Sequence, residues 1–217
     1  MEIIIADEKH IKFSSKISEM IEEAAQKRGT GIAKRTPAYI TGKIQKGDAV
    51  IALAEDQVAG FCYIETWSHG KFVANSGLIV NPDFRNMGLA HKIKAKAFEL
   101  SRTKYPESKL FGITTSLAVL KINSQLGYKP VTFSELTTDE SFWKGCQTCV
   151  NYDILTRTKR SHCLCTGMLF KPGQKEEIKK LNKSERWNRF KNFLKSLNPK
   201  QLLNKPKDIK KLLENES

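Results

Sequence analysis

The chain has 217 residues and a mass of 24.6 kDa, and 40% of its residues are hydrophobic and 28% are charged. This composition is typical of a soluble protein, and the length suffices for one domain with an appendage. No apolar run is long enough to span a bilayer, which excludes a membrane-spanning protein. The first residues, MEIII, lack the basic start and long apolar centre of a signal peptide, so we expect a cytoplasmic protein.

The positive charge is concentrated in the last fifth of the chain. Residues 171–217 hold 14 Lys and Arg against 6 Asp and Glu, a net of +8, which leaves +6 of the total of +14 for residues 1–170. Positive fields attract nucleic acid, anionic membranes and acidic metabolites alike, so charge alone selects none of them. We expect a domain over residues 1–170 and a basic tail over residues 171–217.

The first half of the chain predicts two helices followed by antiparallel strands. Apolar residues recur at helical spacing over residues 10–26, and Thr36 with Pro37 suits the start of a second helix, which ends near Gly47. Short apolar runs bounded by turn residues then predict strands. The predicted strands of this half are residues 3–5, 49–54, 58–64 and 71–80.

The second half continues with a helix over residues 89–100, a strand over 110–115 and a short helix over 117–125 that stops at Gly127. The pattern of residues 151–157 indicates a further strand. We find no internal repeat. This order predicts an α/β protein, with a layered sheet that carries helices on both faces.

The segment from the strand at residues 78–80 to the helix at residue 89 carries the strongest functional signal. A turn that opens into a helix exposes backbone N–H groups and the positive end of the helix dipole, which together can hold a phosphate or pyrophosphate. Gly88 and Ala90 are small enough for a ligand to approach the backbone, and Arg85 adds a cation. The candidate phosphate loop therefore comprises Arg85, Asn86, Met87, Gly88, Leu89 and Ala90.

This Arg-x-x-Gly-x-Ala loop after a strand ending in Val-x-Pro resembles the coenzyme A pyrophosphate loop of the GCN5-related N-acetyltransferase (GNAT) superfamily. The resemblance implies a mixed, mostly antiparallel central sheet with helices on both faces. It also implies an acyl-coenzyme A substrate whose thioester carbonyl meets the backbone of Ile79 and Val80, where negative charge develops during transfer.

Three further stretches resemble the acetyltransferase domain of N-acetylglutamate synthases, a subfamily of these enzymes. They are FGITTS at residues 111–116 with NSQLGYKPV at 123–131, and GIAKRT at 31–36. This resemblance implies transfer of an acetyl or succinyl group from acetyl-CoA or succinyl-CoA to the α-amine of L-glutamate, as in arginine biosynthesis. The amino-acid-kinase-like domain of that subfamily is missing from this sequence, as in its standalone versions.

A dicarboxylate acceptor needs cationic partners, and arginine contacts carboxylates with two parallel hydrogen bonds. Lys34 and Arg35 are the first candidates, although Lys34 equally suits a solvated loop, and Arg157 is a third. Thr115 and Ser116, at the end of a predicted strand, can add hydroxyl contacts.

The catalytic groups are less clear from the sequence. Many GNAT enzymes use a tyrosine to protonate the leaving thiolate, and the corresponding position here is Asn123, which can donate a hydrogen bond but is no general acid. Glu65 and His69, near the end of the strand at residues 58–64, are candidate general bases, but both equally suit a solvated strand end or turn.

Four of the five cysteines form two close pairs, Cys146 with Cys149 and Cys163 with Cys165. This spacing is close to a structural zinc pattern, although Cys-x-Cys is tighter than the usual knuckle, and free cysteines are often small buried apolar groups. We treat zinc as an open alternative and assign no metal site. Cys62, within a predicted strand, is expected in the core.

The tail carries apolar residues among lysines and predicts one or two amphipathic helices that dock on the domain or on a second subunit, as in a homodimer. A basic amphipathic helix can also lie on a membrane or bind nucleic acid, but residues 1–170 show no aromatic residues interleaved with a basic patch.

Two alternatives to small-amine acylation remain open: acetylation of a protein N-terminus or lysine, and a non-catalytic binding module that acts through the tail.

Overall fold

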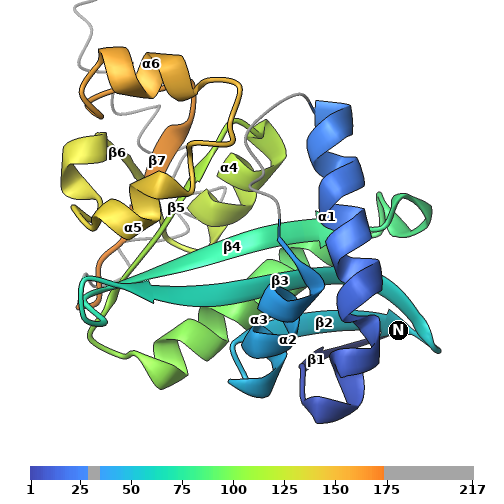
Figure 1. Ribbon diagram of the computed structural model, residues 1–217. Coiled ribbons are helices and arrows are strands. Elements are labelled where there is room, and N and C mark those ends of the chain that lie inside the picture. The colour runs from blue at the N-terminus through green and yellow to red at the C-terminus, as the bar shows by residue number, and fades with distance from the viewer. Residues whose placement is uncertain (29–34, 174–217) are drawn as a thin grey trace, which may run out of the picture. The chain divides into compact units, whose positions relative to one another are not determined.

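The computed structural model describes residues 1–28 and 35–173, and these residues form a seven-stranded sheet in the order β1-β2-β3-β4-β5-β7-β6 (Figure 1). Only β4 and β5 pair in parallel; the other neighbours are antiparallel. The strands are β1 (Glu2–Ile5), β2 (Ala49–Ala54), β3 (Gln57–Trp67), β4 (Phe72–Val80), β5 (Lys109–Thr114), β6 (Lys129–Val131) and β7 (Thr166–Phe170).

Helices lie on both faces of the sheet, as the sequence predicts. The α-helices are α1 (Ser14–Arg28), α2 (Pro37–Gln45), α3 (Leu89–Lys104), α4 (Leu117–Gln125), α5 (Glu140–Lys144) and α6 (Tyr152–Arg157), and short 3-10 helices cover Glu8–Phe13, Pro82–Phe84 and Phe133–Glu135. No helix of the described residues is long and apolar enough to cross a membrane. Of the predicted tail, only residues 171–173 are described, so its helices lie outside the described residues.

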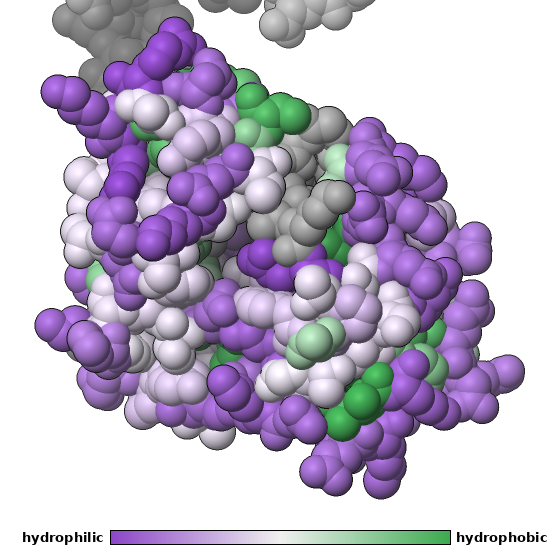
Figure 2. Space-filling model, viewed as in Figure 1, coloured by the Kyte–Doolittle hydropathy of each residue, from purple (hydrophilic) through white to green (hydrophobic). Residues whose placement is uncertain are grey.

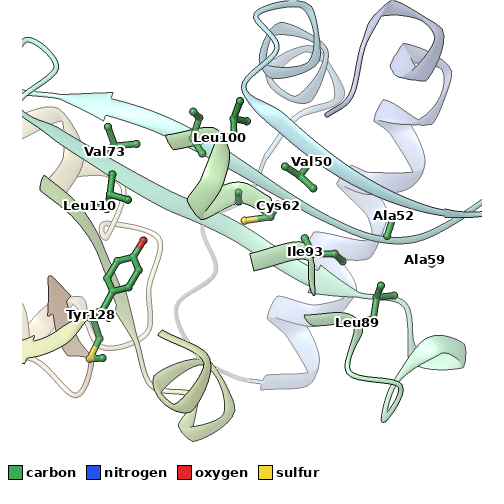
Figure 3. Close-up of a cluster of buried hydrophobic side chains, with 13 residues drawn as sticks. Val50, Ala52, Ala59, Cys62, Val73, Leu89, Ile93, Leu100, Leu110 and Tyr128 are labelled. Atoms are coloured by element: carbon green, nitrogen blue, oxygen red, sulfur yellow. The ribbon is translucent and has the colours of Figure 1, made fainter. Parts of the chain in front are cut away.

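Alternate residues of the central strands supply two separate cores, because side chains of a strand point to opposite faces. Val50 and Ala52 of β2 pack under α3 with Ile93 and Leu100, in the cluster drawn in Figure 3. The alternate residues Ala49 and Ile51 pack against α1 and α2 on the other face. The central strands are therefore buried on both sides, which explains their near-continuous apolar sequence.

A third cluster lies at the other end of the sheet. Phe111 of β5 and Leu169 of β7 pack there with Trp143 of α5 and Leu155 of α6. Phe111 alternates with Leu110, which belongs to the α3 cluster, so α5 and α6 cover the same face of the sheet as α1 and α2. Two separate groups of helices thus share one face, and residues of both groups line the cavity described below.

The prediction of a strand over residues 151–157 is wrong, because these residues form α6. The alternation of apolar and polar residues there resembles a strand, but only Leu155 is buried in this short helix. Asp153 and Arg157 pair one turn apart at 3.3 Å on its exposed side. Arg157 is consequently a surface residue and does not line the cavity described below.

Candidate functional site

A cavity of about 410 Å³ lies where β4 and β5 separate. The two strands pair only between Phe72–Ala74 and Lys109–Phe111, and beyond these residues both strands line the cavity. Residues of α1 and α2 form one wall, and residues of α5 and α6 form the opposite wall. Figure 2 shows the surface hollowed in this region. Strands that diverge leave their facing backbone groups without ladder partners, so a ligand between them can use those groups.

Arg35 lies in this cavity and is positioned by aromatic side chains. Its Nε donates a hydrogen bond to the hydroxyl of Tyr63 at 2.7 Å, and its guanidinium lies 4.9 Å from the ring centre of Tyr39. Burial raises the pKa of Tyr63, so this hydroxyl stays neutral. Arg35 is thus a cation held in a defined place, which suits recognition of a carboxylate.

Glu65 is held beside Arg35 by two donors. The hydroxyl of Tyr39 donates to Glu65 Oε1 at 2.6 Å, and Lys43 Nζ donates to the same oxygen at 2.9 Å. The side chains of Lys43 and Glu65 are only 12% and 19% exposed. Arg35 and Glu65 line this wall of the cavity, whereas Lys43 pairs with Glu65 without lining it, so the three groups together carry a net positive charge.

His69, the other predicted base, lies elsewhere. β3 continues to Trp67 instead of ending at residue 64, and this extension carries His69 to the exposed turn before β4. His69 does not line the cavity. Lys34 lies outside the described residues.

The predicted phosphate loop is an exposed turn at the start of α3. Gly88 occupies the N-cap position in the left-handed conformation at φ +71°, and no side chain caps this end of the helix. Arg85, Asn86 and Met87 are exposed, and the side chain of Asn81 holds the preceding turn by accepting from the N–H of Asp83. The first turn of a 16-residue helix therefore presents its N–H groups to solvent, as an anion site requires.

A bulge in β4 separates this loop from the cavity. Phe61 faces Ile79 and Tyr63 faces Ser76, so Gly77 and Leu78 together face one residue of β3. Gly77 has φ +67°, and a Cβ at this position would run into the ring of Tyr63. The sequence signal is an isolated glycine within a strand, which is typical of a bulge. Beyond the bulge, the side chain of Ile79 is buried against α1 and α2, so Ile79 can meet a ligand only through its backbone.

Thr115 and Ser116 line the cavity at the end of β5. The hydroxyl of Ser116 accepts a hydrogen bond from the N–H of Val119 and so caps α4. Asn123, on the same helix, is 1% exposed and does not line the cavity. Its Oδ1 has no hydrogen-bond partner among the described residues.

A buried lysine that was not predicted from the sequence reaches the cavity from the other face of the sheet. Lys94 of α3 is 2% exposed, and its Nζ donates to the backbone oxygen of Asn75 at 3.0 Å. The side-chain oxygen of the same asparagine accepts from the hydroxyl of Tyr128. Burial lowers the pKa of Lys94 and raises that of Tyr128 well above its usual value.

The four paired cysteines all line the wall formed by α5 and α6. The N–H of Asn151 donates to Cys149 Sγ at 3.4 Å, and burial together with neighbouring thiols raises the pKa of Cys146 to about 11 and that of Cys165 to about 12. Within residues 1–28 and 35–173, no group of three or more His, Cys, Asp or Glu side chains is arranged to hold a metal ion. Cys62 is fully buried in the core under α3.

Comparison with known proteins gave a family match and several similar solved structures. Residues 18–116 match the acetyltransferase (GNAT) family. N-acetylglutamate synthase from Neisseria gonorrhoeae, solved with coenzyme A and N-acetyl-glutamate, is similar over 80% of this chain, with a TM-score of 0.56 and 16% identity. This chain covers 35% of the length of that enzyme.

Two shorter proteins are similar over nearly their whole length. Rv2747 from Mycobacterium tuberculosis, solved with CoA, has a TM-score of 0.56 and 14% identity over 79% of this chain and 99% of its own. The protein yncA from Salmonella typhimurium, solved with its cofactor acetyl-CoA, has a TM-score of 0.55 and 14% identity over 80% of this chain and 95% of its own. A search of curated proteins gave no significant match. At such identities the solved structures establish the fold alone, and the match to the acetyltransferase (GNAT) family covers residues 18–116 of this chain.

Proposed function

We propose that this protein transfers an acyl group from acyl-CoA to the α-amine of an acidic amino acid, with L-glutamate as the acceptor and acetyl-CoA as the first donor to test. The observation that carries this proposal is the placement of Arg35 beside the β4–β5 opening, where Tyr63 and Tyr39 hold its guanidinium. Because Lys43 pairs with Glu65, the net charge of Arg35, Lys43 and Glu65 is positive, which favours an anionic acceptor over a cationic one.

Acyl-CoA would bind on the face of the sheet that α3 covers. The N–H groups at the start of α3 and the cation of Arg85 suit the pyrophosphate, and the pantetheine arm would enter between β4 and β5. The bulge at Gly77 and Leu78 interrupts the β3–β4 ladder, so backbone N–H groups of this segment can turn to the thioester carbonyl.

The acceptor amine must be neutral to attack the thioester. Glu65 is the only carboxylate among the described residues that line the cavity, so it is the group that can take the ammonium proton, directly or through water. Its bonds to Tyr39 and Lys43 fix its position. Holding amine and thioester in line between the two walls can supply about 7–11 kcal/mol of the barrier in favourable cases.

Thiol release by the purified protein tests this proposal. Acetyl-CoA and succinyl-CoA would each be offered with glutamate, aspartate, glutamine, ornithine, a lysine peptide and a peptide with a free N-terminus. We expect turnover with glutamate at a kcat/KM at least 10-fold above glutamine, since glutamine has the same size but lacks the side-chain charge.

The same panel separates the other functions. Turnover with a peptide and none with free amino acids would contradict the proposal and assign a protein acceptor. Coenzyme A binding without turnover of any amine would also contradict it. The ratio of the acetyl-CoA and succinyl-CoA rates identifies the donor.

A further inference from the structure

We propose that Lys94 is the proton donor to the thiolate of coenzyme A as it leaves the acyl group. The proposal rests on the proposed function, because it requires an acyl-CoA thioester in the β4–β5 opening. The proposal supplies a proton donor that is otherwise missing, since the helix position that carries a tyrosine in many GNAT enzymes is Asn123 here.

The position of Lys94 carries the inference. Its Nζ is bound to the backbone oxygen of Asn75, which is the first residue of β4 beyond the pairing with β5. Asn75 also lies two residues before the bulge at Gly77. Lys94 therefore reaches the opening on the face covered by α3, where coenzyme A would bind, and it lines the cavity despite being 2% exposed.

The ammonium has hydrogen-bonding capacity to spare. Lysine offers three donors, and the carbonyl of Asn75 takes one of them. Among the described residues Lys94 makes no other hydrogen bond and no ion pair with a carboxylate. A buried cation without an anionic partner is costly, so its natural complement is negative charge that forms in the cavity.

The neighbouring groups are poorer proton donors. The hydroxyl of Tyr128 is directed to Asn75 Oδ1, and its pKa is raised well above the usual value by burial. The thiol of Cys62 donates to the backbone oxygen of Ser76 at 3.3 Å and does not line the cavity. The amide of Asn123 cannot release a proton at neutral pH.

The proposed step gives one proton to the sulfur of coenzyme A as the acyl group is transferred. The amine nitrogen forms a bond to the thioester carbon, the carbon–sulfur bond breaks, and its electron pair goes to sulfur. One proton moves from the Lys94 ammonium to this sulfur, which gives the free thiol and a neutral lysine; the proton lost by the attacking amine leaves through Glu65 or water. An ordinary lysine has a pKa near 10.4 and an ordinary thiol one near 8.5, so an unperturbed lysine is a reluctant donor to a thiolate. Burial lowers the pKa of Lys94 and so reduces the difference between its pKa and that of the thiol.

Two substitutions separate proton donation from a structural role. Lys94→Met removes the donor, whereas Lys94→Gln can still donate a hydrogen bond to Asn75 but releases no proton. Lys96→Met is the matched control, because it removes a lysine of the same helix that pairs with Glu99 at the surface. Each variant would be assayed with acetyl-CoA and with S-phenyl thioacetate, whose thiolate leaves without needing a proton.

We expect both Lys94 variants to lose about 100-fold in kcat with acetyl-CoA and less than 3-fold in kcat/KM with the aryl thioester, and Lys96→Met to resemble wild type. Wild-type kcat with acetyl-CoA should fall as pH rises through the pKa of Lys94, and this decline should be absent with the aryl donor. Equal losses with both donors, restored activity in Lys94→Gln, or no alkaline decline in the wild type would overturn the proposal.

Calorimetry of coenzyme A binding to wild type separates this proposal from the proposed function. Failure to bind coenzyme A would contradict the proposed function, whereas binding together with turnover that Lys94→Met leaves unchanged would contradict this inference alone.

Discussion

The two faces of the sheet treat buried charge differently at the cavity. On the face covered by α1 and α2, Arg35 and Glu65 are both held by tyrosine hydroxyls, and Lys43 pairs with Glu65. On the α3 face, Lys94 is buried, donates one hydrogen bond to the carbonyl of Asn75, and lies 5.8 Å from the ring centre of Tyr128. The face covered by α1 and α2 is organised before any ligand arrives, whereas the α3 face keeps a cation that lowers stability and becomes useful only when negative charge develops. Stability is commonly sacrificed in this way at functional sites.

The largest effect on acceptor binding should come from Arg35, on the face covered by α1 and α2. Arg35→Ala removes the cation that we expect to bind the acceptor carboxylate, and a hydrogen bond to a charged group contributes about 1.5–3 kcal/mol, so kcat/KM for glutamate should fall about 10- to 100-fold. The loss should appear mainly in KM. Arg157→Ala is the control, because that arginine is exposed on α6; comparable losses in both variants would refute the role of Arg35.

Gly77 forms part of the bulge in β4, and its replacement should be almost as damaging. Gly77→Ala forces an L-residue into positive φ and drives its methyl group into Tyr63, so we expect a loss of about 2–4 kcal/mol in the free energy of unfolding. Gly70→Ala is matched in backbone conformation at φ +80° but has open space around it, so it should lose only about 1 kcal/mol. Equal losses in urea denaturation would show that the contact with Tyr63 is unimportant.

Lys94→Met should stabilise the fold, because replacing buried ionic groups by apolar side chains of similar volume is often stabilising by about 1–4 kcal/mol. The folded-state pKa of Lys94 lies below its unfolded value near 10.4. Between these two values the unfolded chain binds more protons, so wild-type stability contributed by this group rises with pH. The advantage of Lys94→Met is therefore full below the folded pKa and fades as pH approaches 10.4. Denaturation curves at several pH values would refute this if the advantage grew with pH.

The smallest effect concerns the exposed phosphate loop. Arg85→Ala should weaken coenzyme A binding about 5-fold at low salt, and less at high salt, because an exposed charge is screened. Titration calorimetry at two salt concentrations measures both values. A loss that does not depend on salt would argue against a charge contact with the phosphates.

Local signals predicted much of the fold. Thr36 caps α2, with Pro37 at its first position, and α4 spans the nine residues predicted for it. Helix caps and helix bounds depend on residues that are close together in the sequence, so they can be predicted from it directly. The prediction of a strand over residues 151–157 was wrong because α6 has only six residues and one buried side chain, which leaves no helical periodicity to detect.

The site was harder to predict, because its members meet only in three dimensions. Tyr39, Lys43 and Tyr63 read as ordinary residues of a helix or strand, and their bonds to Glu65 and Arg35 span 22 to 28 positions along the chain. Lys94 stands beside Ile93 in a lysine-rich helix, where a lysine is expected at the surface. Only the packing of α3 on the sheet reveals that this lysine is buried.

The most direct test of the account is a crystal structure of the protein grown with coenzyme A and N-acetylglutamate. We predict the pyrophosphate at the start of α3, the pantetheine arm between β4 and β5, and a product carboxylate within hydrogen-bonding distance of Arg35. A product bound away from Arg35, or coenzyme A bound outside the β4–β5 opening, would contradict the account.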